Sequence, residues 1–206
     1  MTVFEMIADE RRQLADLLST LTLQQLETPS LIPTWTVKDV AGHLTLGLRP
    51  SIFKFLWAAL SAGSIEKGTD KLTWEAGRRP VAELVALFRS RADSRFAPPG
   101  IGPQGPLAEL LVHGLDIRVP LGIKREIPAD RATTTLDFLF GGSARGVARK
   151  QWREGLRFEA TDVQFSRGEG PLVRGRSDSL MLAVSGRKEG LDGLEGDGVG
   201  MLRQRL

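Results

Sequence analysis

The sequence predicts an α+β fold, in which an up-down helical bundle is followed by a small α+β domain. Two observations predict it. Apolar residues recur at helical spacing in successive segments over the first two thirds of the chain, whereas apolar and polar residues alternate with a period of two beyond about residue 150. We therefore expect a helical domain over residues 1–145 and a second domain over residues 150–206, with the seam near residues 142–155.

Three threonine motifs mark the starts of helices near the N-terminus. In each, a threonine is followed three residues later by a side chain that can bond back to the backbone, which is a capping box: Thr2 with Glu5, Thr22 with Gln25 and Thr36 with Asp39. They predict a helix over Val3–Leu21, a short helical turn, and a helix that carries His43 about two turns from its start. Pro29 and Pro33 predict an extended link before that helix.

Prolines and glycines delimit the remaining helices. Pro50 is expected to break the helix that carries His43, and Ser51 to restart it through Leu60. The polar, glycine-bearing segment Gly63–Gly77 is expected to be a mobile loop. Further helices are predicted from near Pro80 to before Pro98, over Gly105–Pro120 and over Pro128–Phe140.

The C-terminal segment has the pattern of short strands. Alternation over residues 156–165 predicts a strand pair or one bent strand, followed by a turn at Arg167–Gly170 and a short strand near Val173. A helix is predicted over Ser177–Val184, and the last segment, Val199–Arg203, is predicted to be a strand.

Composition excludes several classes of function. The 206 residues include no cysteine, which excludes disulfides, thiolate metal ligands and a thiol nucleophile from the protein. The net charge is only +3 and the arginines are scattered, so we do not expect nucleic-acid binding. The chain shows no signal-peptide pattern, and its most apolar stretch, Ile52–Ala62, is too short to span a membrane. We therefore expect a cytoplasmic protein without a membrane partner.

The two histidines of the chain, His43 and His113, indicate a metal site. Glu109 precedes His113 by four residues, which places both on one face of a helix, and Asp116 continues the same face. Imidazole with carboxylate suits zinc or another borderline divalent metal. If His43 reaches the same point, three protein ligands leave coordination positions open, as in a catalytic site. The alternatives are that the histidines are ordinary core or surface residues, that Asp39 only caps its helix, and that Asp116 pairs with a cation such as Arg118.

Two motifs resemble those of a known family. IPTWTVKDVAGHL, Ile32–Leu44, resembles the Trp-Thr-Val-x-Asp-Val-x-x-His-Leu motif of the mycothiol-dependent maleylpyruvate isomerases, a branch of the DinB-like metal-binding four-helix bundles. ELLVHGLDIRVPLG, Glu109–Gly122, is similar to the Glu-x-x-x-His-Gly-x-Asp-Ile segment of that family. The C-terminal strings DSLMLAVSGRK and LEGDGVGMLRQRL are similar to its C-terminal domain, so the resemblance covers nearly the whole chain.

The resemblance implies a divalent metal, usually zinc, with ligands at the matching positions His43, Glu109 and His113. Asp39 and Asp116 would orient these ligands, and Arg187 is the best match to an active-site arginine of the C-terminal domain. A low-molecular-weight thiol such as mycothiol would bind the metal as a thiolate and attack a small electrophile, giving an isomerase or an S-transferase.

Two other functions use the same residues. One is a non-catalytic ligand-binding or regulatory module that keeps the bundle, and the other is hydrolysis by a metal-bound hydroxide, which needs no thiol. Both a monomer and a homodimer are compatible with the sequence.

Overall fold

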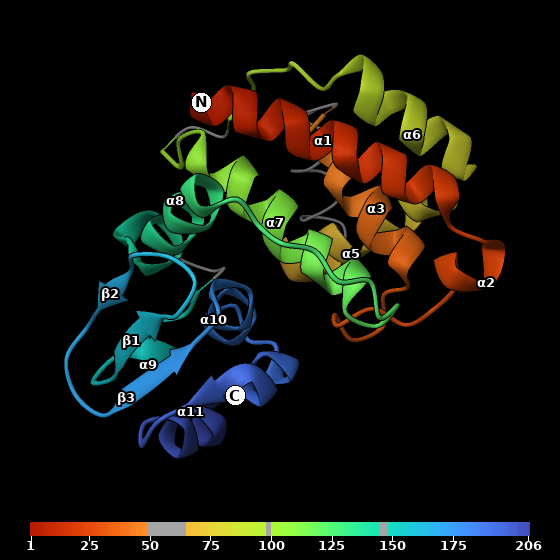
Figure 1. Cartoon of the computed structure of the whole chain (residues 1–206). Helices are drawn as coiled ribbons and strands as arrows, with labels where there is room; N and C mark the ends of the chain where they lie inside the picture. The colour runs from red at the N-terminus through yellow and green to blue at the C-terminus, as the bar shows by residue number, and fades with distance from the viewer. Residues whose placement is uncertain (49–64, 98–99, 145–147) are drawn as a thin grey trace. The chain divides into compact units, whose positions relative to one another are not determined.

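A computed structural model describes residues 1–48, 65–97, 100–144 and 148–206 (Figure 1). The chain divides into two compact units, one formed by Met1–Ala97 with Asp116–Ile123 and the other by Pro98–Leu115 with Lys124–Leu206. The N-terminal part is mostly helical and the C-terminal part holds a small mixed sheet, so the predicted α+β class is confirmed. The predicted domain limits at residues 145 and 150 stay a prediction.

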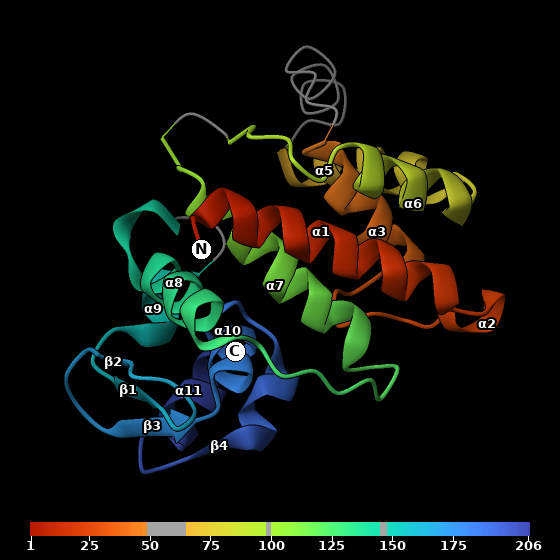
Figure 2. The same cartoon turned by 45° about the horizontal axis from the view of Figure 1, so that its top comes forward.

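The first unit is built from helices that pack in pairs. Its helices are α1 (Val3–Thr20), α2 (Leu23–Leu26), α3 (Val37–Leu46), α5 (Ile65–Gly77) and α6 (Val81–Ser90). Helix α1 packs along α6, and α3 packs against α5, as Figure 1 and Figure 2 both show. Leu14 and Leu18 of α1 and Leu84 and Phe88 of α6 are buried in the core of this unit.

The three predicted capping boxes are all present. At α3, the Thr36 hydroxyl accepts a hydrogen bond from the backbone N–H of Asp39 at 3.1 Å, and the Asp39 carboxylate accepts one from the backbone N–H of Thr36 at 2.9 Å. Thr2 with Glu5 and Thr22 with Gln25 form the same reciprocal pair at α1 and α2. These starts are local in origin, which is why the sequence predicts them correctly.

The prediction of a loop over Gly63–Gly77 is wrong for residues 65–77, which form α5. One face of α5 is buried, with Thr73 and Ala76 nearly inaccessible, and this face packs against α3. Packing against another helix outweighs the poor helix propensity of glycine, which is worth only about 1 kcal/mol per residue. The predicted break at Pro50 and the helix restart from Ser51 to Leu60 lie outside the described residues.

The second unit combines helices with the sheet. Helix α7 (Gln104–Arg118) lies in this unit up to Leu115, and α8 (Ala129–Phe140) follows it. The bounds of α7 and α8 agree with the predicted helices to within three residues. Helix α6 begins next to Pro80, as predicted, but ends earlier than expected. The remaining helical elements of the unit are η1 (Gly142–Ala144), α9 (Lys150–Arg153), α10 (Ser177–Val184), η2 (Lys188–Gly193) and α11 (Val199–Arg205).

The sheet has the strand order β2-β1-β3-β4, with β1 (Arg157–Ala160), β2 (Ser166–Arg167), β3 (Leu172–Gly175) and β4 (Leu194–Glu195). β1 and β3 are parallel, and the outer strands pair with them antiparallel. Phe158 of β1 lies opposite Val173 of β3, and both side chains are fully buried. Helix α10 contacts both of these central strands and also packs on α8.

One prediction about this region is wrong. Val199–Arg203 was expected to be a strand but belongs to α11, where the less exposed apolar residues Val199, Leu202 and Leu206 recur at intervals of three and four, the spacing of one helix face. The predicted strand pair is present as β1 and β2, joined by bends over residues 161–164, although β2 begins only at Ser166.

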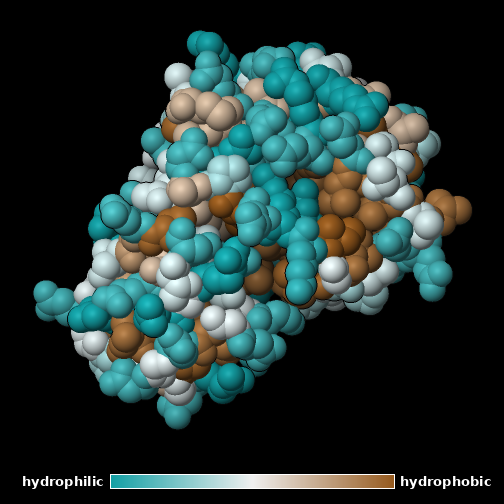
Figure 3. Space-filling view, viewed as in Figure 1, coloured by the Kyte–Doolittle hydropathy of each residue, from teal (hydrophilic) through white to brown (hydrophobic). Residues whose placement is uncertain are grey.

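Polar side chains predominate on one face of the molecule (Figure 3). The face shown in Figure 3 carries polar side chains over most of its area, with apolar side chains in separate groups. No helix within residues 1–48, 65–97, 100–144 and 148–206 is both long enough and apolar enough to cross a bilayer.

Candidate functional site

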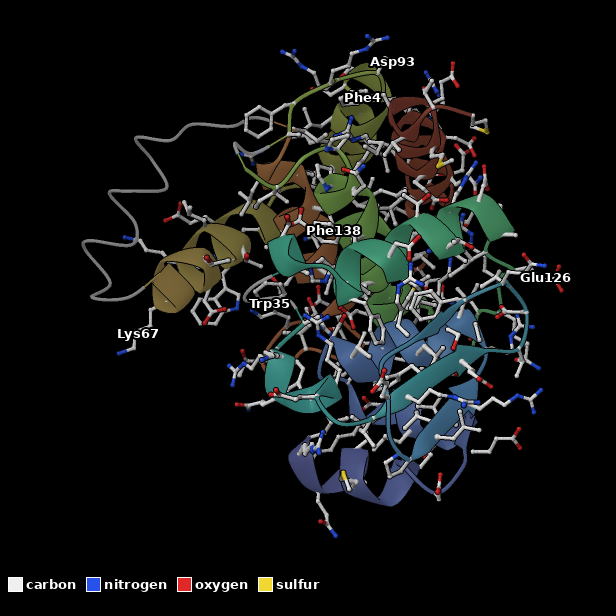
Figure 4. All side chains as sticks on the ribbon, turned by 90° about the vertical axis from the view of Figure 1, so that its left-hand side faces the viewer. Phe4, Trp35, Lys67, Asp93, Glu126 and Phe138 are labelled. Carbon is white, nitrogen blue, oxygen red and sulfur yellow. The ribbon has the colours of Figure 1, made fainter. Side chains whose placement is uncertain are left out.

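His43 lies on α3, and its imidazole ring is held by groups from two other segments. Its Nδ1 atom lies 3.1 Å from the hydroxyl oxygen of Thr73 on α5. The indole of Trp35, labelled in Figure 4, packs on the imidazole with ring centroids 4.9 Å apart and planes inclined by 42°. The indole N–H of Trp35 donates to Asp70 on α5 at 3.1 Å. The orientation of the His43 ring therefore depends on α5 as well as on α3.

Two glycines allow α5 to approach His43 this closely. A Cβ atom at Gly42, the residue before His43, would lie 2.5 Å from the backbone nitrogen of Gly77, which is closer than any real Cβ contact. A Cβ atom at Gly77 would collide with the carboxylate of Asp39. Because both residues lack a side chain, the α3 and α5 backbones meet here, and Thr73, one helical turn before Gly77, comes within reach of His43.

Sequence reasoning missed Thr73 and Asp70 as partners of this site. Both lie in a segment that the sequence analysis treated as a loop, about thirty residues from His43. The spacing of Asp70, Thr73 and Gly77, at intervals of three and four residues, is the signal that indicates one helix face.

Asp39 acts as a capping residue in the structure. Its Oδ2 atom accepts hydrogen bonds from the backbone N–H of Thr36 at 2.9 Å and from the Thr36 hydroxyl at 2.8 Å. These contacts favour the capping role that the sequence left open as the alternative. A further role in orienting His43 stays a prediction.

Glu109 and His113 lie one turn apart on α7, in the second unit. The Glu109 side chain reaches the surface, but protein surrounds much of its carboxyl group. The resulting loss of hydration raises the pKa of this carboxyl, and nearby His113 lowers it by a smaller amount. A carboxyl group that reaches the surface can still be surrounded by protein on most sides, and its charged form then loses part of its hydration. A negative charge that lacks water is stabilised by a cation, so the residue suits a metal ligand.

Asp116, three residues after His113 on α7, is fully buried, and Arg118 is almost fully buried. A buried carboxylate requires a partner, which leaves open both predicted roles of Asp116: orienting a ligand, and pairing with a cation.

The structure places the proposed metal ligands in different units: His43 in the first, and Glu109 with His113 in the second. In the described part of the chain, no three His, Cys, Asp or Glu side chains form a group arranged to hold a metal ion. The set of His43, Glu109 and His113 therefore stays a prediction.

Arg187 follows the C-terminal turn of α10. Gly186 adopts a φ of +86°, its N–H donates to Ala183 O at 3.0 Å, and the N–H of Arg187 donates to Leu182 O at 2.9 Å, which together form a Schellman cap. The Arg187 guanidinium donates to the carbonyl oxygen of Ser185. These bonds give Arg187 a structural role at the helix end, where a cation also complements the helix dipole.

The fold and these residues define a class of protein: a helical N-terminal region with an oriented histidine on α3, followed by a region with a small mixed sheet. Residues 7–98 match the family model described as the mycothiol maleylpyruvate isomerase N-terminal domain. This segment of the chain is therefore similar to that N-terminal domain, as the motif at Ile32–Leu44 indicated.

Two solved structures share the fold. A crystal structure of the mycothiol-dependent maleylpyruvate isomerase is similar with a TM-score of 0.55 and 18% sequence identity, over 96% of each chain. A histidine-to-alanine mutant of a mycothiol-dependent maleylpyruvate isomerase is similar with a TM-score of 0.53 and 17% identity, again over 96% of each chain. Comparison with curated protein sequences gave no significant match.

Proposed function

We propose that this protein is a metal-dependent enzyme, an isomerase or a thiol transferase, that uses a low-molecular-weight thiol, such as mycothiol, to isomerise a small electrophile or to form a conjugate with it. The observation that carries the proposal is the contact between His43 and Thr73. Metal-ligating histidines almost always have their second ring nitrogen held by a hydrogen-bonding group, and the buried Thr73 hydroxyl, 3.1 Å from Nδ1, supplies one. The family model that covers His43, and the solved isomerase structures that share the fold, support the same function.

The donor set suits a divalent ion such as zinc. His43 and His113 would contribute nitrogen and Glu109 would contribute oxygen, and three protein ligands of this kind leave room for a further ligand. When bound, the ion lowers the pKa of a thiol so that it is a thiolate at neutral pH. The chain has no cysteine, so the thiol comes from a small molecule.

The residues of the chain have separate tasks in this proposal. Thr73 and Trp35 orient the ring of His43, and Glu109 supplies the negative charge that balances the cation. Asp116 orients a ligand on α7, and Arg187 holds an anionic group of the substrate. The enzyme acts in the cytoplasm, as a monomer or a homodimer.

The test measures metal content and thiol dependence together. Purified protein, after addition of zinc and removal of the excess, is expected to hold about one equivalent of metal, and the variants His43→Ala and His113→Ala less than about a tenth of that. Glu109→Gln is likewise expected to hold less metal than the wild type, and Glu169→Gln, which changes an exposed carboxylate in a turn, is its control.

Turnover of maleylpyruvate and of other small electrophiles is then measured with and without mycothiol. Turnover that requires both the metal and the thiol supports the proposal. Equal turnover without the thiol would instead indicate metal-dependent hydrolysis, and metal binding without turnover of any substrate would indicate a binding module. Metal content below a tenth of an equivalent in the wild-type protein would exclude the metal site.

A further inference from the structure

The second unit contains a hollow of about 1010 Å³, bounded by the end of α8, by α9 and by residues next to β1 and β2. Its charged lining residues are mostly cations: Arg149, Lys150, Arg153 and Arg167, against the single carboxylate of Glu154. This volume is just above the range for sites that bind small molecules, roughly 300–1,000 Å³, so the hollow is large enough for such a ligand. None of the predicted metal ligands lines it.

Arg153 is the most unusual of these cations. Its guanidinium donates to the carbonyl oxygens of Phe140 and Gly141 and lies over the Phe140 ring, 5.5 Å from the ring centroid. Its Nε atom is buried and has no hydrogen-bond partner among the described residues. Burial lowers the pKa of Arg153, and no carboxylate opposes this effect. The guanidinium is thus partly withdrawn from water, with carbonyl oxygens at the end of α8 as its partners and no carboxylate partner among the described residues, so it can still stabilise an anion beside it.

Arg149, like Arg153, has no carboxylate partner among the described residues. Its guanidinium lies over the Trp152 ring at 5.4 Å, and it forms no ion pair within the described residues. The other two cations do have partners, since Lys150 pairs with Glu154 at 3.1 Å and Arg167 with Asp137 at 2.7 Å. The uncompensated charge of the hollow therefore comes from Arg149 and Arg153.

The hollow also has a rigid apolar wall. The Phe140 ring packs edge-on against Phe158 and Phe165, with centroids 5.0 and 5.1 Å apart, so it is held in one orientation. An aromatic ring beside guanidinium groups that have no carboxylate partner among the described residues suits a ligand that carries an oxyanion on an apolar body, because each part of the ligand meets a matching surface.

We propose that this hollow binds a small organic anion, in which an oxyanion group is carried on an apolar body, with Arg149 and Arg153 as its counter-charges. Carboxylates and phosphate esters share this chemistry. The site does not depend on the proposed metal chemistry, because its residues include no metal ligand.

Isothermal titration calorimetry of the full chain, at an ionic strength fixed with chloride, tests the proposal. The ligands are benzoate, phenyl phosphate, acetate and inorganic phosphate. At least one phenyl compound is expected to bind saturably and about tenfold more tightly than its counterpart without the ring, because the ring buries apolar surface. Comparison of the two phenyl compounds distinguishes a carboxylate from a phosphate ester.

Three variants locate the site. Arg149→Gln and Arg153→Gln are each expected to weaken binding about tenfold, the effect of losing one charge-assisted hydrogen bond. Arg203→Gln removes the same charge from an exposed position on α11 outside the hollow, and is expected to leave affinity unchanged. Arg153 also ties α9 to the end of α8, so if Arg153→Gln does not fold, Arg149→Gln decides the question. The proposal is overturned if none of the four ligands binds saturably, if the ring adds no affinity, or if Arg203→Gln weakens binding as much as Arg149→Gln.

Discussion

The imidazole of His43 and the hydroxyl of Thr73 lie 3.1 Å apart, although thirty residues separate them in the chain. For the Nε2 atom of His43 to bind a metal ion, Nδ1 must carry the proton and donate it to Thr73. Metal binding at Nε2 therefore requires the tautomer in which the Thr73 hydroxyl accepts from Nδ1, and we expect this tautomer although a hydroxyl can also donate to an unprotonated Nδ1.

Replacing Thr73 with valine tests this relationship. Thr73→Val keeps the volume of the side chain but removes the acceptor, and we expect it to weaken zinc binding by about 10- to 100-fold, whereas Thr73→Ser keeps the affinity within a few-fold. Competition with a zinc-binding dye measures the affinity. Thr20→Val, at the exposed end of α1, is the matched control.

Nuclear magnetic resonance of the metal-free protein supplies a second measurement. The ¹⁵N shifts of the His43 ring are expected to report a proton on Nδ1 in the wild type and a mixture of tautomers in Thr73→Val. Unchanged zinc affinity in Thr73→Val, together with unchanged ring shifts, would show that Thr73 does not position His43.

The contact between Gly42 and Gly77 predicts a strong effect on stability. Gly42→Ala would place a methyl group 2.5 Å from a backbone nitrogen, so α3 and α5 must move apart, and we expect a loss of about 1–3 kcal/mol in the free energy of unfolding. Gly47→Ala is the matched control. Gly47 ends the same helix with right-handed backbone angles, and no described residue lies within 4 Å of a Cβ there, so alanine is expected to be neutral or stabilising by up to about 1 kcal/mol. Urea denaturation of both variants measures the difference, and equal stability of the two would contradict a close helix contact.

The capping box of α1 predicts a pH dependence. The hydrogen bond from the backbone N–H of Thr2 to the Glu5 carboxylate, at 2.8 Å, lowers the pKa of Glu5 below its ordinary value of 4.5. A carboxyl whose pKa is lower in the folded state stabilises the fold above its unfolded pKa, and this contribution is lost as the pH falls through the folded pKa. Glu5→Gln is therefore expected to be less stable than the wild type at pH 7, with a difference that shrinks as the pH is lowered below about 4.

Urea midpoints of the wild type and Glu5→Gln between pH 3 and pH 7 measure this difference. Glu83→Gln is the control, because it removes a carboxylate from the first turn of α6, where no side chain caps the helix. A difference between wild type and Glu5→Gln that stays constant over this pH range would contradict the capping role.

The predictions that succeeded from sequence are those with local causes. Residues within a few positions of one another determine the three capping boxes, the helix starts directly after Pro80 and Pro128, and the helix of Glu109 and His113. Helix α5 was missed because its stability comes from packing against α3, which single-sequence periodicity does not reveal. The contacts of Thr73 and Asp70 were missed for the same reason. The hollow lined by Arg149 and Arg153 was missed because the sequence shows charges but not which of them lack a partner.

The carboxylate of Glu109 is expected to lower the stability of the metal-free protein and to strengthen metal binding. Burial raises the pKa of its carboxyl, so the ionised form destabilises the metal-free protein at neutral pH relative to a neutral side chain of the same shape. Glu109→Gln removes this charge, and we expect the metal-free variant to unfold at higher urea concentration than the wild type. Glutamine is a poor ligand for zinc, so the same variant is expected to bind zinc at least about tenfold more weakly. Glu169→Gln, at an exposed turn, should change neither quantity. Lower stability of metal-free Glu109→Gln would show that the carboxylate is stabilised by protein groups, and unchanged zinc affinity would remove it from the ligand set.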